Sequence, residues 1–531
     1  MCDHAPRPKR FDLLTILLVA ALFAGFSLLH APVPGVNEPH YLCKASATWD
    51  SSYCAGDFFL KSQNAHSVFF WVVGYFTQYW SLETVAVSGR IVSAFVLAWG
   101  WVALSSAFSL SRGGTVVSAG LLAAITLTGN LSGEWILGGF ESKVPAWGLG
   151  FVGSAGWLTT TGAAPWRHWL NIGVLLGLST AAHPVVGVWF LIAISMSELA
   201  RLFSPVAQWI ETGSTAGVLK SVSSSLFIMN GTALVVALPG VIPAFKIVTS
   251  SDLSHWERGT ANRIQVFMRL KHHLDPSCFP PAAWIHSTVL MIVIGYCSCR
   301  LLKSSHHRVL RRYLLLLVAA VIVAAAGVAV GSHGGPVVHL PQWSWRAFLL
   351  KFYPFRLIDT LLPVTAALTV TVLVLHTLQN RLVGTDTTIP GFLAVVFMVS
   401  WILKPGPPYG YSLEEYSTWK SACKWIRSET PKDSLFVTPR EAVAFKWYAE
   451  RAQFVSYKDC PQDGAGILEW RQRLRDLGWM RPLQLQRSLK PSDLTWMQRH
   501  MQMTHLITRD HVVTDQAPVY ENTVWRIYDV K

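Results

Sequence analysis

Three short polar clusters stand out in a chain that is otherwise strongly apolar. A carboxylate can act as a general base, imidazoles bind phosphate or metals, and the planar guanidinium group suits phosphate. We expect the three clusters to share one face of a membrane and to form a site for a charged, lipid-linked substrate. Their members are Glu38; Arg269, His272, His273 and Asp275; and Tyr353, Arg356 and Asp359.

The first cluster, residues 37–41 (NEPHY), directly follows the first long apolar run. Held at the membrane edge in a partly dry pocket, Glu38 is predicted to be the catalytic base that deprotonates an acceptor hydroxyl or amine. The alternative is a helix-capping or salt-bridging carboxylate. Asp50 and Asp57, later in the same loop, are secondary candidates, for which a solvated loop position is the favoured alternative.

The second cluster, residues 269–276 (RLKHHLDP), is the densest in polar side chains. His272, His273 and Asp275 can ligate a metal or bind phosphate. Adjacent histidines diverge on a helix, so both could reach one metal only from a loop. We therefore favour contact with a lipid phosphate or a substrate, with Arg269 taking part, and leave metal binding and structural packing as alternatives.

The third cluster begins a late apolar run with Tyr353, Arg356 and Asp359. Charges placed in a membrane are functional candidates by default, and Arg356 is predicted to bind the phosphate. Arg356 and Asp359 are three residues apart and share a helix face, so a buried structural pair is the alternative.

Further secondary candidates precede two other apolar runs. Glu141 and Lys143 lie where a loop enters the membrane and form either a functional site or an ion pair at a helix N-terminus. His183, before Pro184, marks a break between two half-helices, and broken helices in membranes usually line a cavity.

The composition supports a membrane location for these clusters. The chain has 531 residues, of which 51% are hydrophobic and 14% are charged, whereas a soluble protein carries roughly a quarter charged residues. A helix needs about 20 residues to cross the hydrocarbon core. On that rule we predict about eleven spans, at residues 11–31, 88–110, 114–129, 143–163, 169–183, 184–203, 224–245, 283–301, 313–331, 357–378 and 388–403, and an interfacial helix at 66–82.

The distribution of basic residues predicts the orientation. Those near the N-terminus, Arg112, Arg167 and residues 303–312 fall on one side, which should be the cytoplasm. The net charge of +14 is assigned to anchoring loops and to sites for anionic lipid, not to nucleic acid. The predicted transmembrane domain is 1–403, with outer loops 32–87, 130–142, 246–282 and 332–356. Residues 404–531 are predicted to be a small extracytoplasmic α/β domain.

Two pairs of cysteines lie in regions assigned to the outer face. If this face is oxidising, Cys43–Cys54 and Cys423–Cys460 could each form a disulfide. Free thiols are the equal alternative.

The architecture and the first-loop acid Glu38 resemble the GT-C glycosyltransferases, polytopic enzymes that use polyprenyl-phosphate sugars. Many of these carry an acidic pair in the first outer loop, and here Asn37 replaces the first acid. Most of the chain, including residues 272–276 (HHLDP) and 353–356 (YPFR), also resembles an uncharacterised family of bacterial multipass proteins.

The resemblances imply a glycosyltransferase of the bacterial inner membrane. Membrane lipid and a polyprenyl-phosphate-linked sugar would be its partners, its N-terminus would be cytoplasmic and its C-terminal domain periplasmic. A divalent cation is left open, and the lack of a nucleotide-binding glycine loop argues against ATP or a dinucleotide. The alternatives are a transporter or lipid flippase, which fits the broken helices, and a non-catalytic assembly protein.

Overall fold

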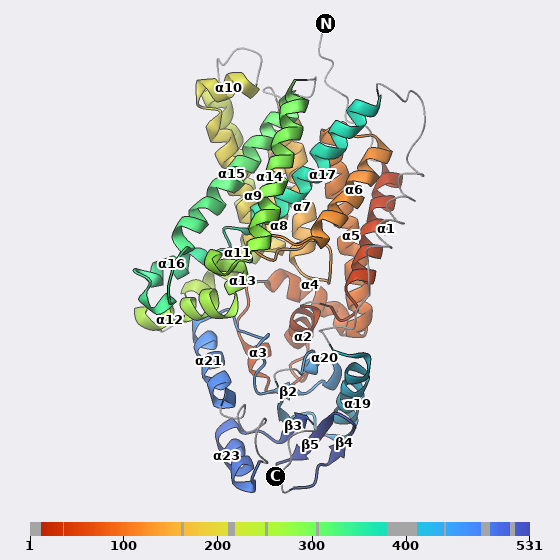
Figure 1. Ribbon diagram of the computed structural model, residues 1–531, viewed down its shortest axis with the longest axis vertical. Coiled ribbons are helices and arrows are strands. Elements are labelled where there is room, and N and C mark those ends of the chain that lie inside the picture. Colours follow the sequence, from red (N-terminus) through yellow and green to blue (C-terminus); the bar gives the residue numbers. More distant parts are fainter. Residues whose placement is uncertain are drawn as a thin grey trace.

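A computed structural model of the protein describes residues 12–35, 37–160, 164–210, 218–249, 253–303, 307–379, 411–439, 442–478, 489–509 and 516–530. It consists of a bundle of apolar helices, a junction of short helices and a small C-terminal α/β region (Figure 1). The N-terminal end of the bundle and the C-terminal region lie at opposite ends of the long axis.

Helices are present at all ten predicted spans that fall within the described residues. They are α1 (Leu13–His30), α5 (Leu82–Ala107), α6 (Arg112–Leu127), α7 (Lys143–Thr159), α8 (Trp166–Ala182), α9 (Pro184–Ala200), α11 (Val218–Thr249), α14 (Pro281–Leu302), α15 (His307–Gly331) and α17 (Arg356–Gln379). The predicted span 388–403 lies outside the described residues.

Six of these helices are long and apolar enough to cross a membrane: α1, α5, α11, α14, α15 and α17. Helices α6 to α9 have 16 or 17 residues, fewer than the roughly 20 that a full crossing needs. The structure therefore supports a multipass membrane protein with six candidate spans in its described part, whereas we predicted about eleven.

The predicted break in the long apolar stretch is confirmed. Helix α8 ends at Ala182, His183 has an extended backbone, and α9 begins at Pro184. Proline fits the first position of a helix because its missing N–H has no partner there, and it cannot continue the helix before it.

Short helices form the junction below the bundle. They are α2 (Glu38–Trp49), α3 (Phe58–Lys61), α4 (Ser67–Thr77), α12 (His255–Ile264), the π-helix η1 (Gln265–Arg269), α13 (Lys271–Leu274), η2 (Pro276–Cys278), η3 (Val337–His339) and α16 (Trp343–Leu350). Helix α10 (Ser204–Ile210) lies at the opposite end of the bundle. The exposed aromatic side chains on and after α4 (Trp71, Tyr75, Tyr79 and Trp80) fit the predicted interfacial helix.

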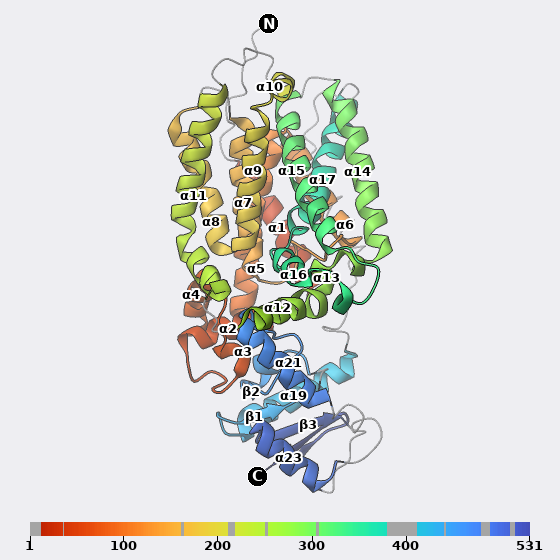
Figure 2. The same cartoon turned by 90° about the vertical axis from the view of Figure 1, so that its left-hand side faces the viewer.

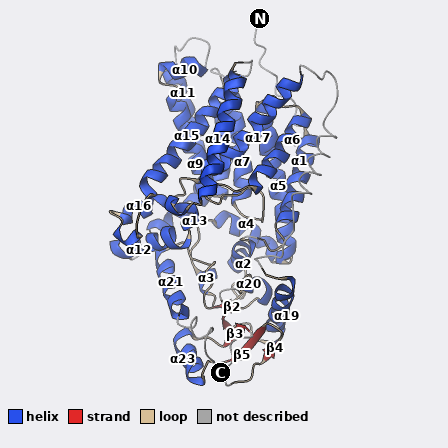
Figure 3. Cartoon of the chain, in the orientation of Figure 1, coloured by secondary structure: helices blue, strands red, loops and turns tan. Residues whose placement is uncertain are grey.

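The C-terminal region holds all the described strands (Figure 3). Its elements are α19 (Leu413–Glu429), β1 (Leu435–Val437), α20 (Phe445–Ala449), β2 (Ala452–Gln453), α21 (Gly464–Gly478), α23 (Pro491–Met501), β3 (His505–Arg509), β4 (Tyr520–Glu521) and β5 (Trp525–Asp529). The sheet order is β2-β1-β3-β5-β4, with β1 parallel to β2 and β3, and β5 antiparallel to β3 and β4.

Local sequence explains several of these elements. Ser412 and Glu415 form a capping box at the start of α19, which satisfies N–H groups that the first helical turn leaves open. The side chain of Asn522 accepts hydrogen bonds from the backbone N–H groups of Val524 and Trp525, which stabilises the turn of the predicted β4–β5 hairpin.

The junction helices hold the C-terminal region against the bundle. In both views α12 and α16 lie between the apolar helices and α21 (Figures 1 and 2). Leu253, beside α12, and Ala261 on it approach Gly464 at the start of α21.

Candidate functional site

A large cavity lies at this junction. It has a volume of about 1210 Å³ and is lined by α2, the loop before α7, α9, α11, α12, η1, α13, α16, the start of α17 and residues 457–467. A cavity of this size can bury most of a large ligand. Residues from all three polar clusters line it.

The cavity has a strongly positive lining. Six basic side chains but only two carboxylates belong to its described lining, so positive groups exceed negative ones by four when the histidines are neutral. Such an excess in a partly buried site favours an anionic ligand. The basic residues are Lys143, Arg258, Arg269, Lys351, Arg356 and Lys458, and the carboxylates are Glu134 and Glu141.

One flank of the cavity is apolar. Ile247 and Val248 of α11 line it together with Trp345, Phe348 and Phe352 of α16 and the turn after it. The three aromatic side chains are also about 40% exposed, at 44%, 40% and 39%. Helix α16 contacts α15, which is apolar enough to span a membrane, as is α11. Exposed aromatic side chains therefore border the cavity on this flank.

Arg356 is held on the cavity wall by Glu134, a residue that the sequence analysis missed. The Arg356 Nε lies 3.0 Å from Glu134 Oε2, and the guanidinium stacks 4.0 Å from the Tyr353 ring centre. Lys143 Nζ lies 3.6 Å from both Glu134 and Glu141. Burial alone would raise the pKa of Glu134, but Arg356 and Lys143 outweigh it and keep this pKa below its usual value.

Asp359 was predicted to belong to the substrate-binding residues, with a structural pair to Arg356 as the alternative. In the structure it binds the backbone of a loop instead. Its carboxylate accepts hydrogen bonds from the backbone N–H groups of residues 131, 132 and 134. Gly133 inside this loop has φ +71°, and a Cβ there would lie 3.0 Å from the His273 ring. Asp359 therefore positions the loop that carries Glu134, and lies outside the cavity lining.

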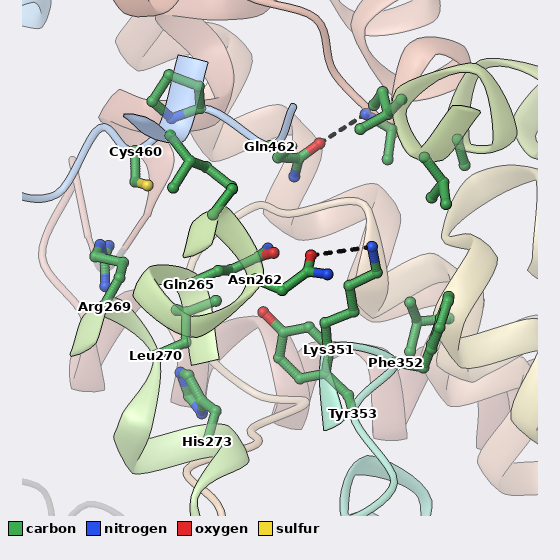
Figure 4. Close-up of a pocket in the computed structure, with 18 of the residues that line it drawn as sticks. Asn262, Gln265, Arg269, Leu270, His273, Lys351, Phe352, Tyr353, Cys460 and Gln462 are labelled. Atoms are coloured by element: carbon green, nitrogen blue, oxygen red, sulfur yellow. Dashed lines mark hydrogen bonds between the residues drawn. The ribbon is translucent and has the colours of Figure 1, made fainter. Parts of the chain in front are cut away.

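The second cluster divides between the cavity and its support. Arg269, His272 and His273 line the cavity, and Figure 4 shows Arg269 and His273 on the same side of it as Leu270. Arg269 donates to the Lys458 carbonyl at 2.9 Å, and its Nε is buried with no hydrogen-bond partner among the described residues. Asp275 is buried outside the lining and accepts hydrogen bonds from the Ser277 N–H and the Cys278 thiol.

His272 and His273 lie with their ring centres 4.0 Å apart. Burial, followed by the neighbouring His272, lowers the pKa of His273 to about 3. His273 is therefore neutral at pH 7, and its Nδ1–H donates to the Ser132 carbonyl. Among the described residues, no group of three or more His, Cys, Asp or Glu side chains could hold a metal ion.

Glu38 lies away from the cavity, in a sealed ion pair with Arg90. Arg90 Nε and Nη2 donate to its two oxygens at 2.6 and 2.7 Å, and both side chains are 0% exposed. The backbone N–H groups of Gly35 and Phe140 donate to the same oxygens at 2.7 Å. With four donors and no access to the cavity, this geometry favours the salt-bridging alternative over a catalytic base.

The secondary candidates differ in position. Glu141, Lys143 and His183 line the cavity, whereas Asp50 and Asp57 do not. Asn37 donates to Glu141 at 2.7 Å, and burial raises the pKa of Glu141 more than Lys143 lowers it.

His183 connects the broken helix with the cavity. Its Nδ1 accepts from the Val186 N–H and caps α9, while its Nε2 lies 3.3 Å from Arg356 Nη1. The ring also lies 4.6 Å from the ring of His66. His183 therefore orients Arg356 at the break between α8 and α9.

Asp50 is a loop residue that accepts hydrogen bonds from Ser52. Asp57, predicted from the sequence to be solvated, is 1% exposed and accepts from the Leu60 and Gln453 N–H groups. It thus joins the first outer loop to the C-terminal region.

Of the two alternatives for the cysteine pairs, the structure has the free thiols: Cys43, Cys54, Cys423 and Cys460 are all unbridged. Cys423 packs in a core on one side of the C-terminal sheet, whereas Cys460 packs against the other core and lines the cavity. Figure 4 shows Cys460 and Gln462 at the edge of the cavity that the C-terminal region supplies.

Comparison with known families gives one local match. Residues 417–477, which run from α19 through most of α21, match the model of a domain of unknown function (DUF6798). A search of curated proteins found no match. The matched segment includes residues 457–467 of the cavity lining, so this domain of unknown function contributes part of the site.

Proposed function

We propose that the protein is a GT-C-like integral membrane glycosyltransferase, which moves a sugar from a polyprenyl-phosphate donor to an acceptor at the outer membrane face. The observation that carries the proposal is the cavity itself, which joins six basic side chains to an apolar flank between α11 and α16. A polyprenyl-phosphate sugar has the matching parts: one phosphate, a long apolar chain and a polar sugar.

Arg356 and Arg269 are the proposed phosphate ligands. Arg356 is anchored through one edge by Glu134 and Tyr353, and Arg269 through one hydrogen bond to a backbone carbonyl. Guanidinium groups fixed in advance stabilise the charge that develops on a phosphate leaving group without reorganising during the reaction. His272 and neutral His273 supply further polar contacts on the same wall.

The prenyl chain is proposed to leave the cavity between α11 and α16. Phe348 and Phe352 line the cavity and are also exposed, so a chain could lie along them with one side in the bilayer. Burial of each CH₂ group contributes about 0.8 kcal/mol, so the chain would supply most of the affinity and the cations the selectivity for phosphate.

Native mass spectrometry of gently purified full-length protein tests the proposal. We expect a co-purified polyprenyl phosphate or its sugar adduct, whose mass identifies the sugar, and its loss in Arg356→Ala. Arg356→Lys, which keeps a charge for Glu134 but not the planar fork, should retain part of the lipid. Arg112→Ala, at an exposed pair with Asp12, is the control and should retain all of it.

Bulk phospholipid alone in every sample would contradict the proposed donor. That result would favour a lipid transporter or a non-catalytic assembly protein.

A further inference from the structure

His40 lines the cavity but has no role in the proposed binding of the donor phosphate. It lies in the first turns of α2 and lines the large cavity. It also lines a second cavity of about 130 Å³, formed with residues 442–446 and 456–459 of the C-terminal region. His40 therefore borders both the charged cavity and a small one on the side of the C-terminal region.

The ring of His40 is fixed by a carboxylate from the C-terminal region. Its Nδ1 lies 3.0 Å from Asp459 Oδ1. The other oxygen of Asp459 accepts from Lys446 at 2.5 Å, and Lys446 lies 3.4 Å from Asp57. The Phe59 ring packs 4.3 Å from the imidazole, centre to centre. Both the tilt and the tautomer of His40 are thus determined by its neighbours.

The protonation states follow from the same contacts. Burial lowers the pKa of His40 and outweighs the opposite effect of Asp459, with Lys44 and Arg269 lowering it further. Burial would raise the pKa of Asp459, but Lys446 and His40 hold it far below its usual value. At neutral pH a neutral imidazole therefore donates its Nδ1–H to an ionised carboxylate. Its Nε2, which has no hydrogen bond to a described residue, is left as a proton acceptor.

We propose that His40 is the general base of the transfer reaction and that Asp459 is its positioning residue, with the acceptor hydroxyl entering through the small cavity. This inference rests on the proposed function. It assigns the base to a residue that the sequence analysis left without a role.

The reaction balances as a single displacement. The acceptor oxygen forms a bond to the anomeric carbon of the donor sugar as the bond from that carbon to the phosphate oxygen breaks. His40 Nε2 takes the acceptor proton, and the polyprenyl phosphate leaves with the bonding electron pair beside Arg356 and Arg269. The proton returns to solvent when the product departs, so no further reactant is needed.

The carboxylates are less suitable for this role. Glu38 is saturated with donors and sealed from the cavity. Glu134 is paired with Arg356 and Lys143. Glu141 lines the cavity, but Asn37 donates to one of its oxygens and Lys143 lies 3.6 Å from the other. Glu141 is therefore the rival that the experiment must include.

The test compares His40→Asn, Asp459→Asn and Glu141→Gln with the unchanged full-length protein in liposomes. Two quantities are measured: binding of polyprenyl phosphate, and sugar transfer from a panel of polyprenyl-phosphate hexoses and pentoses to octyl glucoside. The asparagine in His40→Asn can still donate to Asp459, so the C-terminal region should remain docked. Removal of a general base typically costs about 10²–10⁴-fold in rate.

We expect His40→Asn to bind polyprenyl phosphate normally and to transfer sugar about 10²–10⁴-fold more slowly. Imidazole added to His40→Ala should restore part of the rate, which a structural role would not allow. Asp459→Asn should lower kcat by less and leave binding unchanged.

Three results would overturn the inference. Normal transfer by His40→Asn, or a loss of transfer confined to Glu141→Gln, would remove His40 as the base and leave the transferase standing. Binding without transfer by the unchanged protein would also count against a base, since no reaction would need one. Failure of the unchanged protein to bind polyprenyl phosphate would instead reject the transferase itself.

Discussion

Two buried ion pairs of this protein look alike in chemistry and differ in surroundings. Glu38 at the start of α2 pairs with Arg90 of α5 at 2.6 Å, and Glu134 in the loop before α7 pairs with Arg356 at the start of α17 at 3.0 Å. The first pair is sealed, whereas both members of the second line a cavity. The difference shows that a membrane-edge charge indicates a site only when it faces space that a ligand can enter.

The two pairs also differ in how completely they are satisfied. Arg90 donates to both oxygens of Glu38 and to the Ser27 and Ala31 carbonyls. The pair thereby ties α5 to the end of α1 and the start of α2. Arg356 forms an ion pair with Glu134 and a hydrogen-bond contact from Nη1 to His183 Nε2, but its buried Nε has no hydrogen-bond partner among the described residues. It therefore retains donors for an anion.

The largest expected effect is on stability, at the sealed pair. Glu38→Ala leaves Arg90 buried without its partner, and loss of one member of a buried pair costs about 3–5 kcal/mol of unfolding free energy. Thermal unfolding in detergent measures the change. A Glu38→Met, Arg90→Met double variant should recover much of the loss, and an equally stable Glu38→Ala protein would contradict a structural role.

For the Glu134–Arg356 pair, we expect a substitution to reduce ligand affinity more than stability. Arg356→Ala leaves Glu134 with Lys143 as a nearby cation, so the stability loss should be smaller than for Glu38→Ala. Loss of hydrogen bonds between charged groups, worth about 1.5–3 kcal/mol, should weaken polyprenyl phosphate binding about tenfold to a hundredfold. Titration of both variants with this lipid makes the comparison. A weaker effect of Arg356→Ala than of Glu38→Ala on affinity would reverse the assignment.

The hydrogen bonds from Asp359 to the loop that carries Glu134 should also contribute to the free energy of unfolding. Asp359→Ala leaves the buried N–H groups of residues 131, 132 and 134 without their acceptor. Each buried donor left without a partner lowers the free energy of unfolding by about 1–3 kcal/mol. The loop with Glu134 would lose its position, so affinity for polyprenyl phosphate should fall as well. Asp50→Ala, in an exposed turn, is the control and should change neither quantity.

The smallest expected effect is a pH dependence of anion binding. Burial raises the pKa of Glu141, so this carboxyl takes up a proton at a higher pH than an ordinary glutamate. Protonation removes one negative charge from the lining, and affinity for an anion should therefore rise as the pH falls through this pKa. A polyprenyl methyl phosphodiester, whose charge is constant in this range, is the suitable probe. Glu141→Gln should abolish the pH dependence, and an unchanged slope in that variant would assign it to another group.

The sequence predicted the elements well because their signals are local. Apolar runs located ten helices, Pro184 located the break after α8, and Asn522 located the turn of the last hairpin. The boundaries of α6 to α9 give helices shorter than a full span, which hydropathy alone does not reveal. Local patterns thus determine where helices form better than how far they reach.

The partners within the site could not be predicted in the same way, because they are far apart in the chain. Glu134 meets Arg356, and Asp459 meets His40, across hundreds of residues. Gly133, beside Glu134, was the available local signal for a tightly turned loop. The three polar clusters did identify Arg269, His272, His273, Tyr353 and Arg356, all of which line the cavity.

A structure of the full-length protein in a lipid nanodisc with added polyprenyl phosphate would show whether this lipid occupies the cavity. We expect phosphate density within hydrogen-bond distance of Arg356 and Arg269, with the prenyl chain leaving between α11 and α16. A cavity without this lipid under saturating conditions, or a lipid phosphate bound elsewhere on the bundle, would contradict this expectation.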